Sequence, residues 1–191
     1  QKGKTFEAKG VYYTDLGSAI SEADGETIRL IANAEWTGAL RDFYSADINI
    51  DGNGFTLTLT QVIVINTGST MHLTNITVDL NKKCFKAHGS SGHIIYGKGC
   101  TLINGGSDFG GATTSEGKGS VVTMLPGSKI SGAKGIMGCG IASLTGGTIE
   151  LLGGIIENGT SEQTGAVLIN SGARVVIGGD FTLKNNKKGS S

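Results

Sequence analysis

The chain has 191 residues, with 33 glycines, one proline, and 16 basic side chains against 16 acidic ones. This balance gives no excess of positive charge that would favour binding to nucleic acid or to an anionic membrane surface. Branched apolar residues recur along the whole length, which excludes a disordered chain, and the glycines follow no G-x-y period, which excludes collagen. No apolar run reaches the roughly 18 to 20 residues that a membrane-spanning helix needs. The composition therefore indicates one all-β domain with many tight turns.

The first 25 residues are predicted to form a cap that differs from the rest of the chain. Thr14 or Asp15 can cap a short helix, which Gly25 then ends. The apolar positions of this helix fall on one face: Leu16, Ile20 and Ala23. A repetitive β-structure needs such a cover, because its terminal turn otherwise leaves apolar side chains open to water.

Short alternating strands follow, beginning with residues 27–31. In the stretch 47–51, two isoleucines alternate with polar residues, and the Asp-Gly-Asn-Gly sequence at 51–54 turns the chain. The same alternation continues at 55–60, 71–73 and 76–80. A period of two with glycine breaks is typical of strands buried on one face.

Internal similarity is clearest in the second half of the chain. The stretches GIASLTGGTIELLGGIIENG, from Gly140, and GAVLINSGARVVIGGDFTLKNN, from Gly165, share three short strands and a Gly-Gly turn. Comparable units are predicted to open at Gly119 and Gly99, which gives repeats of about 20 to 25 residues and about seven or eight turns. Such repeats must stack to share one core, so we predict a right-handed parallel β-helix rather than a β-sandwich.

These repeats resemble those of pectin-lyase-like β-helix proteins on bacterial surfaces. The opening run TDLGSAISEADGETIRLIANAEW is similar to the helix and first strand that begin many members of that group. The resemblance covers nearly the whole chain and implies the fold and an extracellular habit, but it carries no catalytic motif. That group includes polysaccharide lyases, hydrolases, adhesins and phage tailspikes, so it does not fix an activity.

We predict a single domain over residues 1–191, with a cap at 1–25, helical turns at 26–186 and a tail at 187–191. The positions expected to point inward are Ile28, Leu30, Ile48, Ile50, Leu57, Leu73, Val78, Leu102, Met124, Ile149, Val167, Ile169, Val175 and Ile177.

A lyase site would need clustered acids to hold calcium and an arginine or lysine as base. The only local combination of this kind is Arg41, Asp42, Asp47 and Asp51, although the last two flank one strand. Calcium is accordingly the one ion that such a site would recruit, and no resident cofactor is expected. A glycosidase would need two carboxyl groups about 5 to 10 Å apart. The candidate pairs are Glu150 with Glu157 and Asp51 with Asp79, and solvated acids on outward positions are the favoured interpretation.

Cys84, His88, His93 and Cys100 combine the side chains that ligate zinc within 17 residues. Their spacing departs from common zinc-site patterns, so a metal site is disfavoured. A disulfide between the two cysteines is one alternative. The favoured alternative buries Cys100 as a small apolar residue, leaves Cys84 in the core or a loop, and leaves both histidines in solvent.

Aromatic residues gather near the N-terminal end. Trp36, Phe43 and Tyr44 fall in a segment, 32–46, that breaks the strand pattern and is predicted to be a loop. Exposed rings there would bind the apolar face of a sugar, since loops on a rigid scaffold often carry binding residues. The alternative is that Trp36 and Phe43 fold back over the first turn.

The absence of a visible catalytic constellation favours a non-catalytic module for adhesion or carbohydrate binding. We expect it to lie outside the cell or on its surface, within a longer chain, with a glycan or host-surface partner and neither nucleic acid nor a membrane span. A polysaccharide lyase or related enzyme is the first alternative, and a structural spacer is the second.

Overall fold

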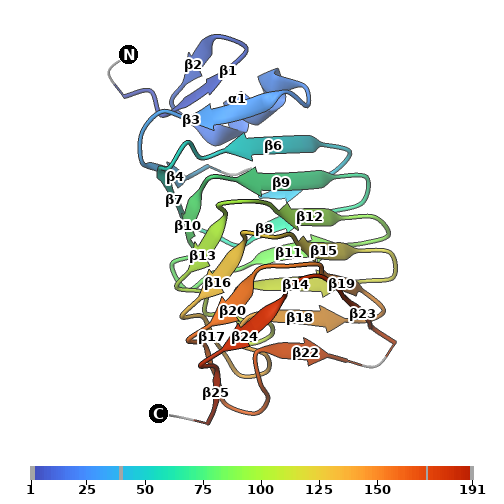
Figure 1. The fold of residues 1–191 in the computed structure, drawn as a ribbon. Helices are drawn as coiled ribbons and strands as arrows, with labels where there is room; N and C mark the ends of the chain where they lie inside the picture. Colours follow the sequence, from blue (N-terminus) through green and yellow to red (C-terminus); the bar gives the residue numbers. More distant parts are fainter. Residues whose placement is uncertain (1–2, 39–40, 171, 190–191) are drawn as a thin grey trace.

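In the computed structural model of the chain, which describes residues 3–38, 41–170 and 172–189, the fold is a β-solenoid of about six turns (Figure 1). Each full turn contributes one strand to each of three parallel sheets, and the turns are stacked along one axis. The predicted parallel β-helix is therefore confirmed, but the predicted number of about seven or eight turns is too high.

Sheet A, with nine strands, has the order β2 (Val11–Tyr13), β1 (Phe6–Ala8), β3 (Thr27–Leu30), β6 (Asp47–Asp51), β9 (Thr70–Thr74), β12 (His93–Tyr96), β15 (Val121–Met124), β19 (Thr148–Leu151) and β23 (Arg174–Ile177). Sheet B contains β4 (Ala34–Trp36), β7 (Thr56–Leu59), β10 (Thr77–Asp79), β13 (Thr101–Ile103), β16 (Lys129–Ser131), β20 (Ile155–Glu157) and β24 (Thr182–Lys184). Sheet C contains β5 (Asp42–Phe43), β8 (Ile63–Ile65), β11 (Phe85–His88), β14 (Thr113–Glu116), β18 (Ile141–Leu144) and β22 (Val167–Ile169). A small sheet D lies between sheets B and C in the chain and consists of β17 (Lys134–Gly135), β21 (Thr160–Ser161) and β25 (Lys187–Lys188).

The register of sheet A shows that the turns differ in length. Met71 of β9 pairs with Ile94 of β12, 23 residues later, whereas Ile94 pairs with Val122, 28 residues later. Four of the five extra residues lie between sheets B and C, because Leu102 follows its partner Val78 by 24 positions whereas Thr113 follows its partner Phe85 by 28. There the fourth turn carries a loop at 104–112, and the later turns carry the strands of sheet D.

The N-terminal cap contains the predicted helix, α1 (Leu16–Ala23). Asp15 is its N-cap residue, and its Oδ1 accepts the N–H of Ser18 at 2.8 Å. Gly25 follows with a φ of 82°, as expected at a helix end. A hairpin of β1 and β2, which the sequence pattern did not predict, precedes the helix and extends sheet A. No helix in the described part of the chain is both long and apolar enough to cross a membrane.

The core consists of the inward rows of the three sheets. Ten of the fourteen predicted inward residues are buried, from Ile28 to Ile149. The four exceptions belong to the last strands of sheets A and C: Val167, Ile169, Val175 and Ile177. Their positions in the rows are inward, but no further turn of the described chain lies against them.

Two other predictions are corrected by the register. Ile141 pairs with Val167, so the units from Gly140 and Gly165 are equivalent as predicted, but Val122 pairs with Ile149 rather than with Ile141. The proposed openings at Gly119 and Gly99 therefore fall on different faces of the solenoid. Lys187 and Lys188, expected in a tail, form β25 and pair with β21.

Candidate functional site: a polar groove at the corner between sheets B and C

The loop at 104–112 leaves the solenoid after β13 and folds onto the next turn. The carbonyl of Asp108 accepts the backbone N–H groups of Ile136 and Met137 at 3.0 and 2.9 Å, and the N–H of Gly110 donates to the Met137 carbonyl at 2.9 Å. A parallel bridge also joins Phe109 to Met137. These bonds hold the backbone of the loop as an additional layer above sheet D.

Glycines allow this close approach. Gly111 has a φ of 44°, and a Cβ at this position would overlap the carbonyl oxygen of Cys139 in the neighbouring turn. At Gly110, with a φ of 68°, a Cβ would overlap the backbone nitrogen of Ala142 in that turn. The pair therefore lets the backbone of the loop touch the turn below it, which a residue with a side chain cannot do without displacing the backbone.

A groove of about 350 Å³ lies between this loop and sheet D. We call it the corner groove; its lining residues are Gly106, Ser107, Asp108, Lys134, Gly135, Ile136, Thr160, Glu162 and Gly189. Its volume falls in the range of small-ligand sites. The groove thus takes residues from the fourth turn, from the two turns below it, and from the segment after β25.

The chemistry of the corner groove is that of a polar binding site. Asp108 and Glu162 bring carboxylates that accept hydrogen bonds, Lys134 brings an ammonium donor, and all three residues are exposed. Ser107 and Thr160 add hydroxyl groups, which donate and accept. Such a set fits a neutral ligand with many hydroxyl groups, because every group of the wall matches one of its donors or acceptors.

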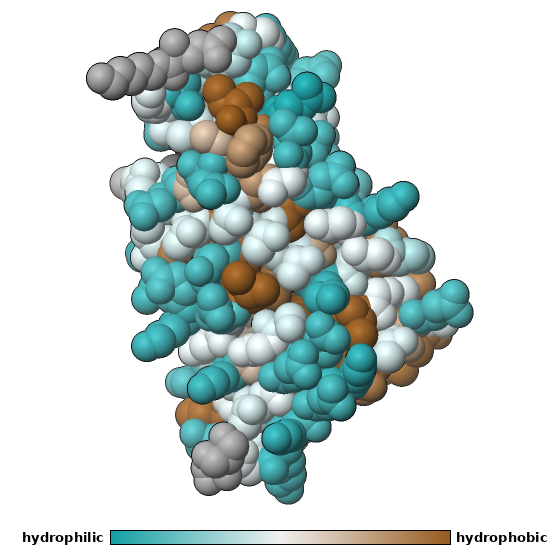
Figure 2. Space-filling view, turned by 60° about the vertical axis from the view of Figure 1, so that its left-hand side comes forward, coloured by the Kyte–Doolittle hydropathy of each residue, from teal (hydrophilic) through white to brown (hydrophobic). Residues whose placement is uncertain are grey.

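An aromatic ring lies next to the groove in the chain. Phe109 follows Asp108, and 44% of its surface is exposed, which is unusual for this side chain. A ring in that position offers an apolar face beside the carboxylates. Elsewhere on the molecule, the side that carries sheet B is mostly polar, with apolar residues in separated patches (Figure 2).

Two features of the sequence at 104–112 indicate this loop, although the repeat pattern does not predict it. The run NGGSDFGGA at 104–112 has no strand alternation, and it places an acid and an aromatic residue between two glycine pairs. A repeat length of about 20 to 25 residues for every turn leaves no room for an inserted loop, so the loop was not predicted. Glu162 and Thr160, by contrast, reach the groove only through the stacking of β21 on β17, which the sequence does not show.

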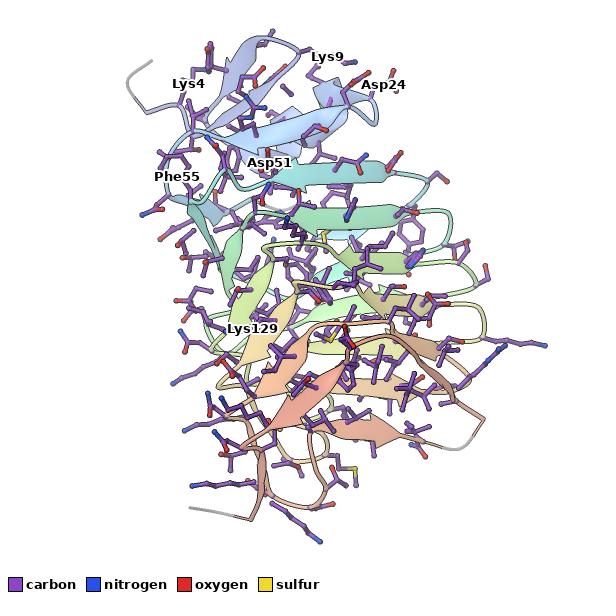
Figure 3. All side chains as sticks on the ribbon, viewed as in Figure 1. Lys4, Lys9, Asp24, Asp51, Phe55 and Lys129 are labelled. Carbon is purple, nitrogen blue, oxygen red and sulfur yellow. The ribbon has the colours of Figure 1, made fainter. Side chains whose placement is uncertain are left out.

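The four residues predicted for a lyase site are not gathered in one place. Arg41 pairs with its neighbour Asp42 at 3.7 Å on the sheet C side, whereas Asp47 and Asp51 lie at opposite ends of β6 in sheet A. Asp51 faces Arg29 at 3.9 Å instead. Its position at the junction of sheets A and B is marked in Figure 3.

The predicted carboxylate pairs have structural partners. Asp51 Oδ1 accepts the N–H of Asn53 at 2.9 Å and an amide proton of Asn75 at 3.3 Å. Asp79 Oδ1 repeats this arrangement with Asn81 and Asn104, at 2.9 and 3.1 Å. Both acids thereby fix turns in the stack.

The other predicted pair is likewise divided. Glu157 forms an ion pair with Lys129 at 3.2 Å on sheet B (Lys129 is labelled in Figure 3), and Glu150 lies on sheet A.

The cysteines and histidines also lie apart. Cys84 and Cys100 are buried with free thiols, and burial raises the pKa of both. His88 lies on sheet C, where its Nδ1 contacts Asn66 Oδ1 at 2.9 Å, and His93 lies on sheet A. The described residues contain no group of three or more His, Cys, Asp or Glu side chains placed to hold a metal ion.

The predicted aromatic platform is divided between the core and the surface. Trp36 and Phe43 are buried and meet edge to face, with ring centroids 5.8 Å apart, and Tyr44 is exposed. The segment 32–46 is not a loop, because it contains β4 and β5 of the first turn. Trp36 therefore cannot stack on a ligand while the first turn is folded.

A hydrogen-bonded row crosses the outer face of sheet A. His93 Nε2 contacts Thr123 Oγ1 at 2.9 Å, and Thr123 Oγ1 donates to Glu150 Oε2 at 2.8 Å. Because the only hydroxyl proton of Thr123 is directed at the carboxylate, Nε2 of His93 is the donor in the first contact. The row joins three successive turns.

Comparison of the chain with protein-family models, curated protein sequences and solved structures finds no match. The chemistry of the site is therefore inferred from its geometry.

Proposed function

We propose that the chain is an extracellular or cell-surface β-helix module that binds carbohydrate, and that the corner groove is its binding site. The observation that carries this proposal is the convergence of Asp108, Lys134 and Glu162 from three turns on one groove of ligand size. The sequence resemblance to pectin-lyase-like β-helix proteins of bacterial surfaces supports the same setting and the role of an adhesion module.

Sugar hydroxyl groups are recognised by polar side chains that are held in place before binding. The backbone of Asp108 is held in place, because its carbonyl accepts two N–H groups. The backbone of Glu162 is also held, because its N–H donates to the carbonyl of Gly135 at 3.1 Å. Phe109 adds an exposed ring on the same loop, so polar side chains on a held backbone lie beside an apolar face.

Binding is favoured over catalysis because the candidate acids of the first two turns are spread over two sheets and engaged with local partners. A lyase or hydrolase is therefore the rival that the test must address.

The test is direct binding to a broad panel of glycans and polysaccharides, with calcium and with a chelator. We expect saturable binding by the native chain and a loss of about 10- to 100-fold in Asp108→Asn and in Glu162→Gln, the range for a hydrogen bond to a charged group. Phe109→Ser should weaken binding as well. Glu35→Gln, an exposed acid on β4, is the matched control and should bind as the native chain does.

Each other result has a defined meaning. If the groove variants bind glycan as well as the native chain does, the site lies elsewhere. If the native chain binds no glycan of the panel, the proposal of carbohydrate binding is wrong. Shortened oligosaccharides in the native sample, absent from the Asp108→Asn sample, would replace the binding module by an enzyme at the same groove. Dependence on calcium alone would show that an ion takes part in recognition.

A further inference from the structure

The corner groove is the middle part of a longer polar surface that follows the solenoid axis. On the side of the cap, a hollow of about 340 Å³ shares Lys134 with the groove and is also lined by Lys82. On the opposite side, a hollow of about 460 Å³ shares Thr160 with the groove and is also lined by Lys187. We call the groove and these two hollows together the corner surface.

Three lysines of the corner surface lie on alternate turns. Lys134 of β17 and Lys187 of β25 both pair with the same residue of β21, so one turn separates them. One turn also separates Lys82 from Lys134, because their N–H groups donate to the carbonyls of Asn104 and Gly105 in the turn between them, both at 2.8 Å. Successive lysine backbones are therefore two strand spacings apart along the axis, a distance of roughly 10 Å.

The turns between the lysines carry the two acids of the corner groove. Asp108 belongs to the turn between Lys82 and Lys134, and Glu162 belongs to the turn between Lys134 and Lys187. All five residues are exposed, and no ion pair joins them in the described part of the chain. The corner surface therefore presents charges that alternate in sign from one turn to the next.

The remaining acid of the corner surface is already engaged by the fold. Asp79 lines the hollow next to the cap, and its Oδ1 accepts the N–H of Asn81 at 2.9 Å and an amide proton of Asn104 at 3.1 Å. A neutral ligand satisfies the middle of the surface, but it leaves Lys82 and Lys187 without a counter-charge. The ends of the surface therefore favour a ligand that carries negative groups.

The spacing of the charges restricts where such groups must lie. In an extended chain of β-linked pyranoses, each sugar advances the chain by about one strand spacing, so successive sugars lie over successive turns. Acidic groups on every second sugar then meet the three lysines as charge-assisted hydrogen bonds. The hydroxyl groups of the intervening sugars meet Asp108 and Glu162, whereas acidic groups on those sugars would be repelled by the same two carboxylates.

Building on the proposed function, we infer that the ligand of the corner surface is a polysaccharide with one acidic group for every two sugars, bound along the solenoid axis. The alternation of Lys82, Lys134 and Lys187 with Asp108 and Glu162 carries this inference. An ammonium group pairs with a carboxylate or with a sulfate, so the acidic group is defined here by its charge and its spacing.

The test measures the affinity of four oligosaccharides of one common length, long enough to span the three lysines. Fragments of hyaluronate and of κ-carrageenan carry one carboxylate or one sulfate for every two sugars, fragments of polygalacturonate carry one carboxylate on every sugar, and cello-oligosaccharides carry none. We expect a fragment of the first kind, with carboxylate or with sulfate, to bind about 10- to 100-fold more tightly than the other two, the product of three exposed ion pairs. This affinity should fall as the salt concentration rises.

A triple variant with Lys82→Gln, Lys134→Gln and Lys187→Gln should lose that preference. The matched control removes the same charge at three exposed lysines away from the corner surface: Lys4→Gln, Lys98→Gln and Lys118→Gln. The control should bind as the native chain does, and circular dichroism and thermal unfolding confirm folding of both variants.

The outcomes separate this inference from the proposed function. If a neutral glycan binds as tightly as the acidic fragments and Asp108→Asn weakens both, the corner groove binds carbohydrate but the inferred charge pattern is wrong. If polygalacturonate binds as tightly as hyaluronate and κ-carrageenan, the surface reads charge without reading its spacing, and the inference is again wrong. Equal losses in the triple variant and its control would also overturn it. If no glycan binds at all, the proposed function itself fails.

Discussion

The Thr123 hydroxyl donates to Oε2 of Glu150 at 2.8 Å, although the two residues are 27 positions apart in the chain. The bond joins neighbouring strands of sheet A, and Thr123 also accepts from His93. Thr123→Val keeps the shape of the side chain and leaves both partners unpaired, so we expect a loss of about 1 to 3 kcal/mol in the free energy of unfolding, measured by urea denaturation. Thr58→Val, at an outward position of β7, should change it by less than about 0.5 kcal/mol. If Thr123→Val and Thr58→Val lower the free energy of unfolding equally, the hydrogen bonds of Thr123 to His93 and Glu150 do not stabilise the fold.

His93 predicts a dependence of stability on pH. Burial lowers the pKa of His93, and nearby His72 lowers it further, against the opposing effect of the Glu150 carboxylate. The unfolded chain therefore binds this proton more readily than the folded chain. The contribution to stability is complete above about pH 6.5 and is lost as the pH falls toward the folded pKa.

The urea midpoint of the native chain should accordingly fall between about pH 7.5 and about pH 5.5, and His93→Gln should reduce that fall. His88→Gln, which changes an exposed histidine on sheet C, is the control and should leave it in place. An identical fall in native chain and His93→Gln would assign the pH dependence to other groups.

Trp36 is a test of stability rather than of binding. Its ring is fully buried and lies against Phe43 and Phe85, with centroid separations of 5.8 and 6.3 Å. Trp36→Ala should lower the free energy of unfolding by about 3 to 5 kcal/mol, as measured by chemical denaturation. Trp36→Phe should cost less, since it keeps an aromatic ring, and Nε1 has no hydrogen-bond partner in the described part of the chain. If Trp36→Ala instead keeps the native stability and no longer binds glycan, Trp36 is a binding residue, as the sequence predicted.

Gly111 and Gly132 form a matched pair for testing the loop at 104–112. Both have a positive φ, 44° and 67°, but a Cβ on Gly132 meets nothing within 4 Å, whereas one on Gly111 would overlap Cys139. Gly132→Ala should therefore cost about 1 to 2 kcal/mol from backbone strain alone. Gly111→Ala should cost more and should weaken glycan binding at the corner groove. Equal losses of stability in denaturation experiments would contradict the tight packing of the loop.

The repetitive part of the fold could be predicted because each of its turns obeys local rules. The alternation around Ile48 and Ile50 fixes an inward row, and Asp15 followed by Leu16 fixes the start of α1. The buried Trp36 was misplaced for a physical reason: β4 is only three residues long, too short for its alternation to be distinguished from a loop. Ile177 was predicted in the core from its row, but burial also requires a neighbouring turn.

The candidate site was less predictable than the fold. The pairing of Lys134 with Thr160 brings together residues 26 positions apart, and the length of each turn decides which residues meet. That length is not constant, so glycine spacing assigns the units that open at Gly99 and Gly119 to the wrong face of the solenoid. Asp108 and Glu162 consequently had no visible relationship in the sequence.

Most of the extra length of the lower turns lies at one corner. Leu102 still pairs with Ile130 in sheet B and Thr113 still pairs with Ile141 in sheet C, on the two sides from which the loop departs. The scaffold therefore tolerates insertion at 104–112 without any change in the pairing of its three main sheets. The loop can therefore be exchanged while the stack is kept, and the same position is where a foreign recognition peptide is best grafted.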